Sequence, residues 1–368
     1  MSRLSRAQQQ ERNRAEVLAA ARREFTERGF RDTKVDGIAE RAGLTRGAVY
    51  SNFPSKRALY FAVLADDAER VPDEPRTEPG LTPREALGAF ARAWVTRLPL
   101  STDDHSSARL AMDLMPEVLA HDRTRRPFAQ LMRLQAILLG LSLERLRGPA
   151  RAGGRLVRIA ETALTTLSGA TQLAATAPGF LEPFNVIRAC EHLADLDLDD
   201  TWPPPHTPHI RTPTLTADEP WSPPAALDAV RGEPARLDGD GVVAVLGLHR
   251  LAAAEEAERA APPDVDVTAV LVTGDPGELA PLTRLALADF RHCLHQAFPA
   301  SAWPRLQVVC DDSAAVAAAA GLPAVSDVTE SAVHVDGRRR LVARADGVGA
   351  CHSAASTLGR VQGDVTTP

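Results

Sequence analysis

The spacing of apolar residues over the first 200 positions is that of amphipathic helices. Apolar side chains recur three and four positions apart, with short breaks at Gly, Pro, Asp or Ser. Near the N-terminus, for example, Val17, Ala21 and Phe25 lie four apart and form one apolar stripe. The breaks predict helices over 8–28, 35–42, 46–52, from Ser55 onward, and over 82–98, 103–120, 124–147, 151–177 and 183–196.

The pattern changes twice after residue 200. Residues 201–225 contain eight prolines, and proline fixes φ and lacks an amide donor, so this stretch cannot form a helix or a central strand. We expect a semi-rigid linker over 201–236. From 237 onward, short Val- and Leu-rich runs alternate with Ala-rich helical stretches, which is typical of an α/β domain. The runs predict strands over 241–248, 266–273, 306–310, 331–336 and 339–345, and helices over 250–261, 277–298, 313–320 and 351–359.

The charge of the chain is unevenly distributed. The whole chain has 42 Lys and Arg against 48 Asp and Glu, a net charge of −6, which on average argues against a nucleic-acid partner. The first 60 residues, however, have a net charge of +6 and the remainder has −12. Because phosphate attracts the basic segment and repels the acidic one, we expect any DNA contact to be confined to the N-terminal head.

Composition and cysteine spacing exclude several other classes of protein. A hydrophobic content of 44% and a charged content of 24% are ordinary for a soluble globular protein. No apolar run approaches the ~20 residues of a membrane span, and the polar N-terminus lacks a signal-peptide core. The cysteines are too far apart for a disulfide scaffold or a CxxC zinc module. We expect a cytoplasmic protein that is not an enzyme and has no metal, cofactor or membrane partner.

The two short helices over 35–42 and 46–52 predict a helix-turn-helix. They are joined by Ala-Gly-Leu, Thr33 and Thr45 occupy their expected N-cap positions, and Ser55 is the expected N-cap of the next helix. The second helix carries small or hydrogen-bonding residues, a mixture that fits the major groove and reads base edges. Spacing alone also allows a plain three-helix bundle in which these side chains are solvated surface.

A longer pattern surrounds this motif. Over about 55 residues the chain reads GF, T-x-V-x-x-IA-x-x-AG, T-R-G-x-x-Y-x-x-F and S-K-x-x-L in continuous order. With its flanks, this segment resembles the DNA-binding domain of the TetR (tetracycline-repressor-like) family of bacterial regulators. The resemblance implies a DNA-binding domain over 1–67 with contacts from Thr33, Lys34, Thr45, Arg46, Gly47, Tyr50, Ser51, Asn52 and Lys56.

The resemblance also implies how these contacts divide. Arg46 and Gly47 would open the recognition helix and face bases, while both threonines, Tyr50 and Lys56 would mostly hold phosphates. Asn52 stands where many members of the family have His. A cationic Lys56 beside a positive helix terminus also suits an anion on physical grounds.

Residues 68–200 resemble the helical regulatory domain of the same family in layout. The layout implies an effector-binding and dimerisation domain, with the two helices over 151–196 pairing with their copies in a second subunit. The stripe expected at that interface is Leu156, Ile159, Ala163, Thr166, Leu167, Ala170 and Leu173. Candidates for the lining of an effector pocket are Trp94, Met112, Met115, Phe128, Met132 and Gln135, although Met and aromatic residues at helical spacing are more often plain core.

The C-terminal elements follow the order βαβαβαββα. With the AAAAGLP turn, the VHVDG hairpin and the closing Gly347, residues 237–368 resemble a thioredoxin- or peroxiredoxin-type domain. The redox chemistry of that fold needs a low-pKa cysteine at the helix after the first strand, where this chain reads GLHR over 247–250. Cys310 and Cys351 remain candidate sensor thiols, although buried inert cysteines are the favoured interpretation. His292 and His295 lie three apart on a helix but have no supporting carboxylate for a metal.

The predicted fold is therefore an all-α helix-turn-helix and regulatory region over 1–200, followed by a thioredoxin-like α/β domain. The predicted function is that of a sequence-specific regulator, a homodimeric repressor released from a palindromic operator by a small effector. Two alternatives stay open at this stage. One is a redox-sensing regulator that uses the C-terminal cysteines, and the other is a bifunctional protein with a thiol-redox domain.

Overall fold

A computed structural model describes residues 5–72, 78–98, 110–147, 154–202 and 215–356. Its N-terminal half is helical, as predicted. The predicted helix over 103–120 falls largely outside the described residues, and only its end is seen, as α7. The helices of this half are α1 (Arg6–Asp32), α2 (Val35–Arg41), α3 (Arg46–Asn52), α4 (Lys56–Glu69), α5 (Pro83–Val95), α7 (Leu114–Leu119), α8 (Asp122–Arg147), α9 (Val157–Thr176) and α10 (Pro183–Leu193).

The helix boundaries in the first 60 residues follow from their caps. Thr45 and Ser55 each accept a hydrogen bond from the amide three residues on, as predicted for N-caps. Gly29, with φ of 74°, bends the chain near the end of α1. The prediction for Thr33 as a cap is wrong. The N-cap of α2 is Lys34 without a side-chain bond, and the Thr33 hydroxyl donates instead to the carbonyls of Glu24 and Gly29.

The C-terminal half is built on a six-stranded sheet in the order β1-β8-β7-β4-β5-β6. The strands β4, β5 and β6 are parallel, while β7, β8 and β1 run antiparallel to their neighbours. The helices α11, α12 and α13 lie between the strands in sequence, and residues 350–356 are helical. The strands are β1 (Leu215–Pro220), β4 (Gly241–Gly247), β5 (Asp266–Val272), β6 (Gln307–Cys310), β7 (Glu330–Val335) and β8 (Arg340–Asp346), and the helices are α11 (Ala253–Ala260), α12 (Pro276–Ala297) and α13 (Ala315–Ala319).

Part of the predicted linker belongs to this sheet. Residues 215–220 form β1, which pairs with β8, and the prediction of a linker is wrong for them. A two-stranded ladder follows, β2 (Leu227–Asp228) with β3 (Glu233–Pro234). Trp221 is buried under the sheet, and its indole donates to the carbonyl of Leu237. Residues 203–214 of the predicted linker lie outside the described residues. For 215–220 the expectation that the proline-rich stretch forms no central strand is confirmed, because β1 lies at the edge of the sheet, where a missing amide donor is tolerated.

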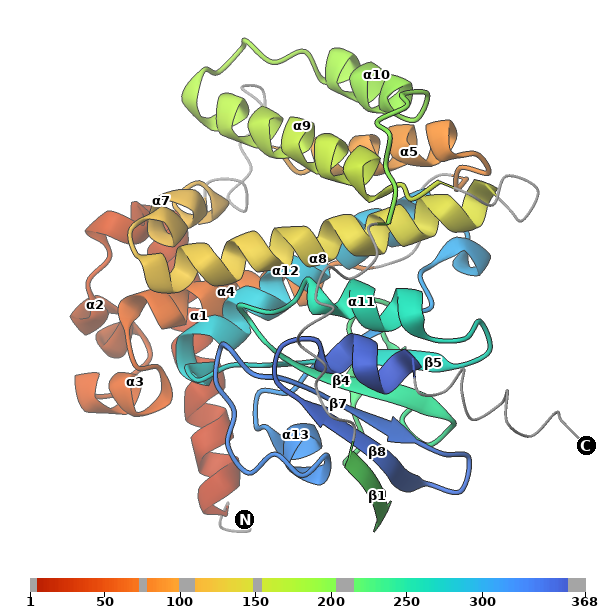
Figure 1. Ribbon diagram of the computed structural model, residues 1–368. Coiled ribbons are helices and arrows are strands. Elements are labelled where there is room, and N and C mark those ends of the chain that lie inside the picture. The colour runs from red at the N-terminus through yellow and green to blue at the C-terminus, as the bar shows by residue number, and fades with distance from the viewer. Residues whose placement is uncertain (1–4, 73–77, 99–109, 148–153, 203–214, 357–368) are drawn as a thin grey trace, which may run out of the picture.

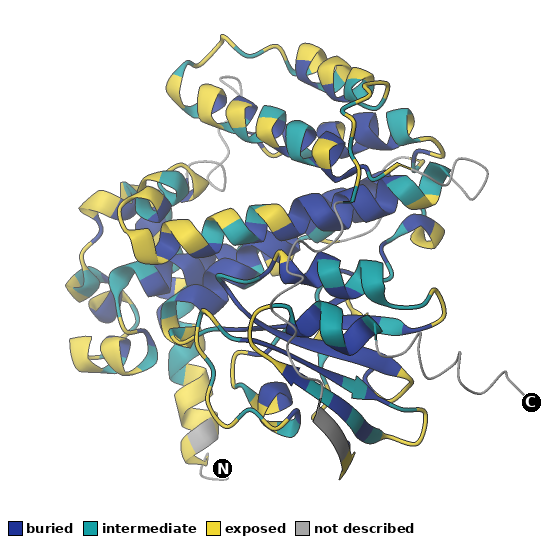
Figure 2. Ribbon diagram, viewed as in Figure 1, coloured by how far each residue is buried: buried dark blue, intermediate teal, exposed yellow. Residues whose placement is uncertain are grey.

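The two halves share one hydrophobic core. Alternate residues of β4 point to opposite faces of the sheet: Val243 and Val245 pack toward α13, whereas Val242, Ala244 and Leu246 belong to the same core cluster as the helices α1 to α10. The element that joins them is α12, which runs across the molecule between the sheet and α4, α5 and α8 (Figure 1). Figure 2 shows most of α12 and the strands β4, β5 and β7 in dark blue, which marks them as buried.

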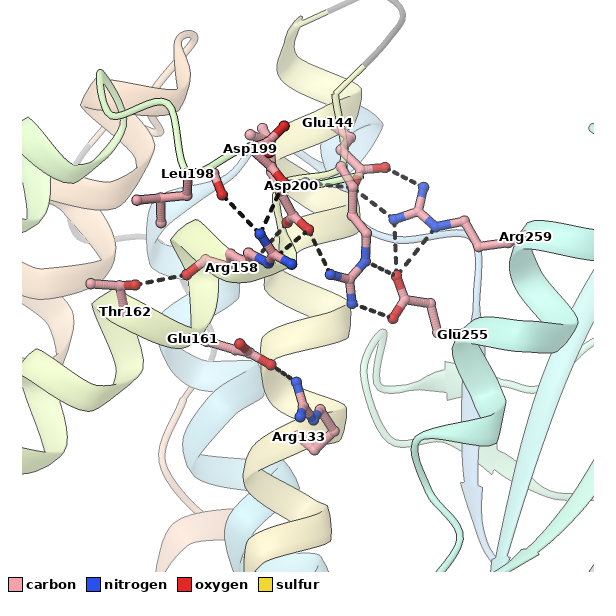
Figure 3. A network of polar contacts seen from close by, with 12 residues as sticks. Arg133, Glu144, Arg158, Glu161, Thr162, Leu198, Asp199, Asp200, Glu255 and Arg259 are labelled. Atoms are coloured by element: carbon pink, nitrogen blue, oxygen red, sulfur yellow. Dashed lines mark hydrogen bonds and ion pairs between the residues drawn. The ribbon is translucent and has the colours of Figure 1, made fainter. Parts of the chain in front are cut away.

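A network of ion pairs seals the same junction, and Figure 3 shows it from close by. Arg155, just before α9, donates to Glu255 of α11 at 2.6 Å and to Asp200 at 2.7 Å. Arg259 of α11 pairs with Glu144 of α8 at 2.7 Å and also contacts Glu255. The side chains of Asp200 and Glu255 are each only 4% exposed. The guanidinium of Arg155 lies between these two buried carboxylates and gives both of them a close cationic partner.

The stripe predicted for the subunit interface lies mostly inside the chain. Ile159, Ala163, Leu167 and Ala170 are all buried in the single chain, on the side of α9 that packs on α8 and α5. Only Leu173 of the stripe is exposed. The large apolar side chains that α9, α10 and their connection do expose are Leu173, Phe180 and Phe184.

Candidate functional site

The N-terminal head is held as a rigid unit by aromatic and ionic contacts. Phe25, Phe30 and Tyr60 form one ring cluster, with the Phe25 and Tyr60 centroids 5.3 Å apart and edge to face. The buried carboxylate of Glu24 in α1 accepts from Arg41 of α2 at 2.7 Å, which fixes the first helix of the motif on α1. A rigid mount of this kind sets the direction in which α3 projects.

One side of α3 is open to solvent. Its buried residue is Val49, which packs inward, and the helix stands at the edge of the molecule (Figure 1). The Arg46 guanidinium is 61% exposed, lies 5.5 Å from the Tyr50 ring and is 3.5 Å from Asp36. This weak contact leaves Arg46 free to reach another partner. Six of the nine predicted contact residues are exposed here, namely Lys34, Thr45, Arg46, Gly47, Tyr50 and Ser51.

The other three predicted contact residues make bonds within the chain. The Lys56 ammonium donates to the carbonyls of Phe30, Arg31 and Thr33 at 2.8, 3.4 and 3.1 Å, and partial burial lowers its pKa. All three of its donors are therefore engaged, and a phosphate contact there would replace one of them. Thr33 is buried with its hydroxyl on two carbonyls, and the Asn52 amide donates to the carbonyl of Ala48.

A cavity of about 370 Å³ lies among the middle helices. Five of the six residues predicted from the sequence line it, and Met112, which is 45% exposed, does not. The cavity is mainly apolar and of a size typical for small-molecule sites. The predicted residues in its wall are Trp94, Met115, Phe128, Met132 and Gln135.

Sequence reasoning missed one wall of this cavity. Residues of α12, including Leu282, Leu285 and Ala286, line it opposite the helical region. A signal was present in the sequence, since the segment 277–298 carries apolar residues around its whole circumference rather than on one face. A helix of that kind is buried on all sides and must pack against more than its own sheet.

The four cysteines are poor nucleophiles. Burial raises the pKa of Cys190, Cys293 and Cys310 to about 12 and that of Cys351 well above its usual value. At neutral pH each is a thiol, and a thiol does not attack peroxide or disulfides. His292 and His295 are buried on α12, and the His295 ring stacks on Trp303 at 3.9 Å.

We therefore expect the native protein to resist a thiol reagent such as dithionitrobenzoate at neutral pH, and the unfolded protein to release all four thiols. The measurement is the absorbance of the released thiolate with and without denaturant. Rapid reaction of Cys310 or Cys351 in the folded protein would contradict this expectation and favour redox sensing.

Two further features bear on the kind of site present. Within the part of the chain that the structure describes, no three His, Cys, Asp or Glu side chains are grouped to hold a metal ion. None of the helices in that part combines the length and apolarity that a bilayer crossing demands.

The comparisons with known proteins concern mainly the head. Residues 17–63 match the family model described as bacterial regulatory proteins, tetR family. The resemblance seen in the sequence is thereby confirmed for this segment, which is a TetR-type helix-turn-helix.

Curated relatives agree over a similar part of the chain. The uncharacterized HTH-type transcriptional regulator YdgC of Bacillus subtilis is 31% identical over 108 residues, which cover 28% of this chain and 55% of that protein. The HTH-type transcriptional regulator TtgR of Pseudomonas putida is 47% identical over 51 residues, 14% of this chain and 24% of TtgR. The chain spans about half the length, or less, of the curated relatives it matches.

Among solved structures, GusR of Salmonella enterica aligns with 50% of this chain and 96% of its own, at 20% identity and a TM-score of 0.37.

Proposed function

We propose that this protein is a sequence-specific DNA-binding transcriptional regulator, a repressor that leaves its operator when a small ligand binds. The observation that carries the proposal is the exposed face of α3 on a basic, rigidly mounted TetR-type head. Arg46 at the start of α3 is placed to reach base edges, and guanidinium to guanine is the commonest specific contact in the major groove.

The proposal includes a homodimer. A single α3 reads only a few base pairs, and a two-fold pair of heads would read the two halves of a palindrome. The exposed apolar side chains Leu173, Phe180 and Phe184 support an interface over α9, α10 and their connection, because large apolar groups so exposed favour association. The buried stripe of α9 would then pack inside each subunit, beneath the proposed interface, and would not contact the second subunit.

We further propose that the α/β domain is a redox-inactive thioredoxin-like domain. The element order βαβαβαββα predicted from the sequence supports this, as do the antiparallel β7 and β8 beside the parallel β4 and β5. Where such a fold would carry its reactive cysteine, this chain has Gly247 and Leu248. The raised pKa values of the Cys310 and Cys351 thiols speak against both redox alternatives.

Substitution of Arg46 tests the DNA-binding proposal. Arg46→Ala is expected to weaken binding to a selected operator by about 1–3 kcal/mol and to relax base preference at one position per half-site, with a smaller loss on random DNA. Fluorescence anisotropy with labelled duplexes at fixed salt measures both affinities.

Arg70→Ala is the matched control for this test. Arg70 is as exposed as Arg46, at 61%, but lies at the far end of α4. The Arg70→Ala substitution should leave the affinities for the selected operator and for random DNA nearly unchanged. Equal losses from the two variants, or from specific and random DNA, would contradict base reading by Arg46.

A further inference from the structure

The cavity lies between the two halves of the chain rather than inside the regulatory helices. Its near walls come from α5, α7, α8 and α9, and its far wall is the face of α12 that carries Leu282, Leu285 and Ala286. The two walls are tied together beside the cavity, because the Gln135 amide of α8 donates to the carbonyl of Ala286 at 2.7 Å. The appended α/β domain is thus part of the site.

The polar groups in the wall define what the cavity can bind. Arg97 and Asp289 form an ion pair with each other, so their charges cancel, and the Cys293 thiol is neutral. The Trp94 indole donates to the Thr171 hydroxyl at 3.0 Å. Gln135, only 4% exposed, has a side-chain oxygen without a hydrogen-bond partner. A buried acceptor in this state is costly, and a ligand donor would satisfy it.

The wall on α12 is also in contact with the DNA-binding head. Glu278, in the first turn of α12, accepts from Arg57 at 2.8 Å and from the Ser55 hydroxyl at 3.2 Å. Leu282, the first residue of α12 in the cavity wall, lies one helical turn further on. A methyl group added at Gly277 would stand 2.9 Å from Pro54, in the turn between α3 and α4. A shift of α12 would therefore displace the turn that joins the recognition helix α3 to α4.

From these contacts we propose that the cavity binds an uncharged, mainly apolar small molecule with one N–H or O–H donor. The donor bonds to Gln135 Oε1, the apolar body packs on α12, and displacement of α12 reaches the head through Glu278. The coupling of α12 to the head, which is the second half of this proposal, rests on the regulator function proposed above. The first half, ligand binding, does not.

The ligand half is tested on the full chain with N-phenyl-1-naphthylamine, a neutral apolar fluorophore with a single N–H donor. Its fluorescence is expected to rise to saturation at one probe per chain. The ether 1-phenoxynaphthalene has nearly the same shape but an acceptor in place of the donor, and as a competitor it should bind at least tenfold more weakly. Absence of saturable binding, or equal affinity for both compounds, would overturn the proposed ligand chemistry.

Three variants test whether the probe binds in this cavity. Ala286→Trp fills the cavity from α12 and should weaken the probe at least tenfold, whereas Ala189→Trp, at an exposed position of α10, should not. Gln135→Met removes the acceptor and should abolish the preference for the amine over the ether. Full binding by the Ala286 variant with native circular dichroism would place the probe elsewhere and overturn the role of α12.

The coupling half uses operator DNA obtained by selection with the intact protein. Saturating probe should lower operator affinity by a factor of about 5–150. Glu278→Gln should leave probe affinity unchanged and reduce that factor toward one. An unchanged factor in this variant would overturn transmission through Glu278. A failure to select any operator would refute the regulator function and with it the coupling, while the fluorescence titration would still decide on the ligand site.

Discussion

Replacement of Arg155 by Ala is expected to lower the free energy of unfolding by about 3–5 kcal/mol. The substitution leaves the carboxylates of Asp200 and Glu255 buried and without their shared cation. Removing one partner from a buried ion network costs far more than the net value of the pair. The more distant cations Arg158, 3.7 Å from Asp200, and Arg259, 3.2 Å from Glu255, would then be the partners left to these carboxylates. Urea unfolding followed by circular dichroism measures the loss as a lower midpoint.

The control for this experiment is Arg84→Ala. Arg84 pairs with Asp195 between α5 and α10, but the two side chains are 43% and 54% exposed. A pair so well hydrated contributes about 0–1 kcal/mol, so the midpoint should hardly move. Similar shifts for the two variants would mean that the network in Figure 3 does not hold the two halves of the chain together.

Replacement of Phe290 by Ala, as a separate variant, is also expected to lower the free energy of unfolding by about 3–5 kcal/mol. Phe290 lies in the middle of α12, is fully buried, and its ring centroid is 5.9 Å from that of Phe90 in α5. Because α12 belongs to the cores of both halves, the variant should still unfold in a single transition. Coincidence of the circular dichroism and tryptophan fluorescence curves tests this.

Leu81→Ala is the control, since it removes a large apolar side chain from a position that is 71% exposed and lies outside the proposed subunit interface. Its effect on stability should stay within about 0.5 kcal/mol. If Phe290→Ala separated the unfolding of the helical and α/β regions into two transitions, the shared core would be refuted, and the C-terminal region would be an independently folding domain.

The head was the part of the fold most accessible from sequence. Its helix ends are set by local chemistry, such as the Thr45 and Ser55 caps and the positive φ of Gly29, and local chemistry can be read from neighbouring residues. Thr33 misled because a hydroxyl near a helix start has two possible uses. It can accept from the helix amides, or it can donate backward to the preceding helix, and here it does the second.

Lys56 and α12 show why the remainder was less predictable. Lys56 lies in the first turn of a helix, where a phosphate is a reasonable partner, but the fold brings three carbonyls from the end of α1 to its ammonium. The apolar circumference of α12 shows that it is buried, but periodicity does not say by what. Contacts between residues more than 200 positions apart, such as Arg57 with Glu278, have no local signature.

The same reasoning explains the partial success with the cavity. Trp94, Met115, Phe128, Met132 and Gln135 lie on the middle helices and line the cavity, and methionine adapts well to irregular apolar ligands. Met112 shares the residue type but lies on the solvent side of its segment. Residue type therefore predicted the near walls, while the far wall required the tertiary structure.

The measurement that tests the central claim most directly is selection of DNA by the intact protein, followed by footprinting of the selected sequence. Genomic fragments that include the region upstream of the protein's own gene are the natural pool. The account predicts enrichment of a sequence with two inverted half-sites, protected together, with contacts at one position per half-site lost in the Arg46→Ala variant. Recovery of no common sequence, or protection that is indifferent to Arg46, would contradict the claim that this chain reads DNA through α3.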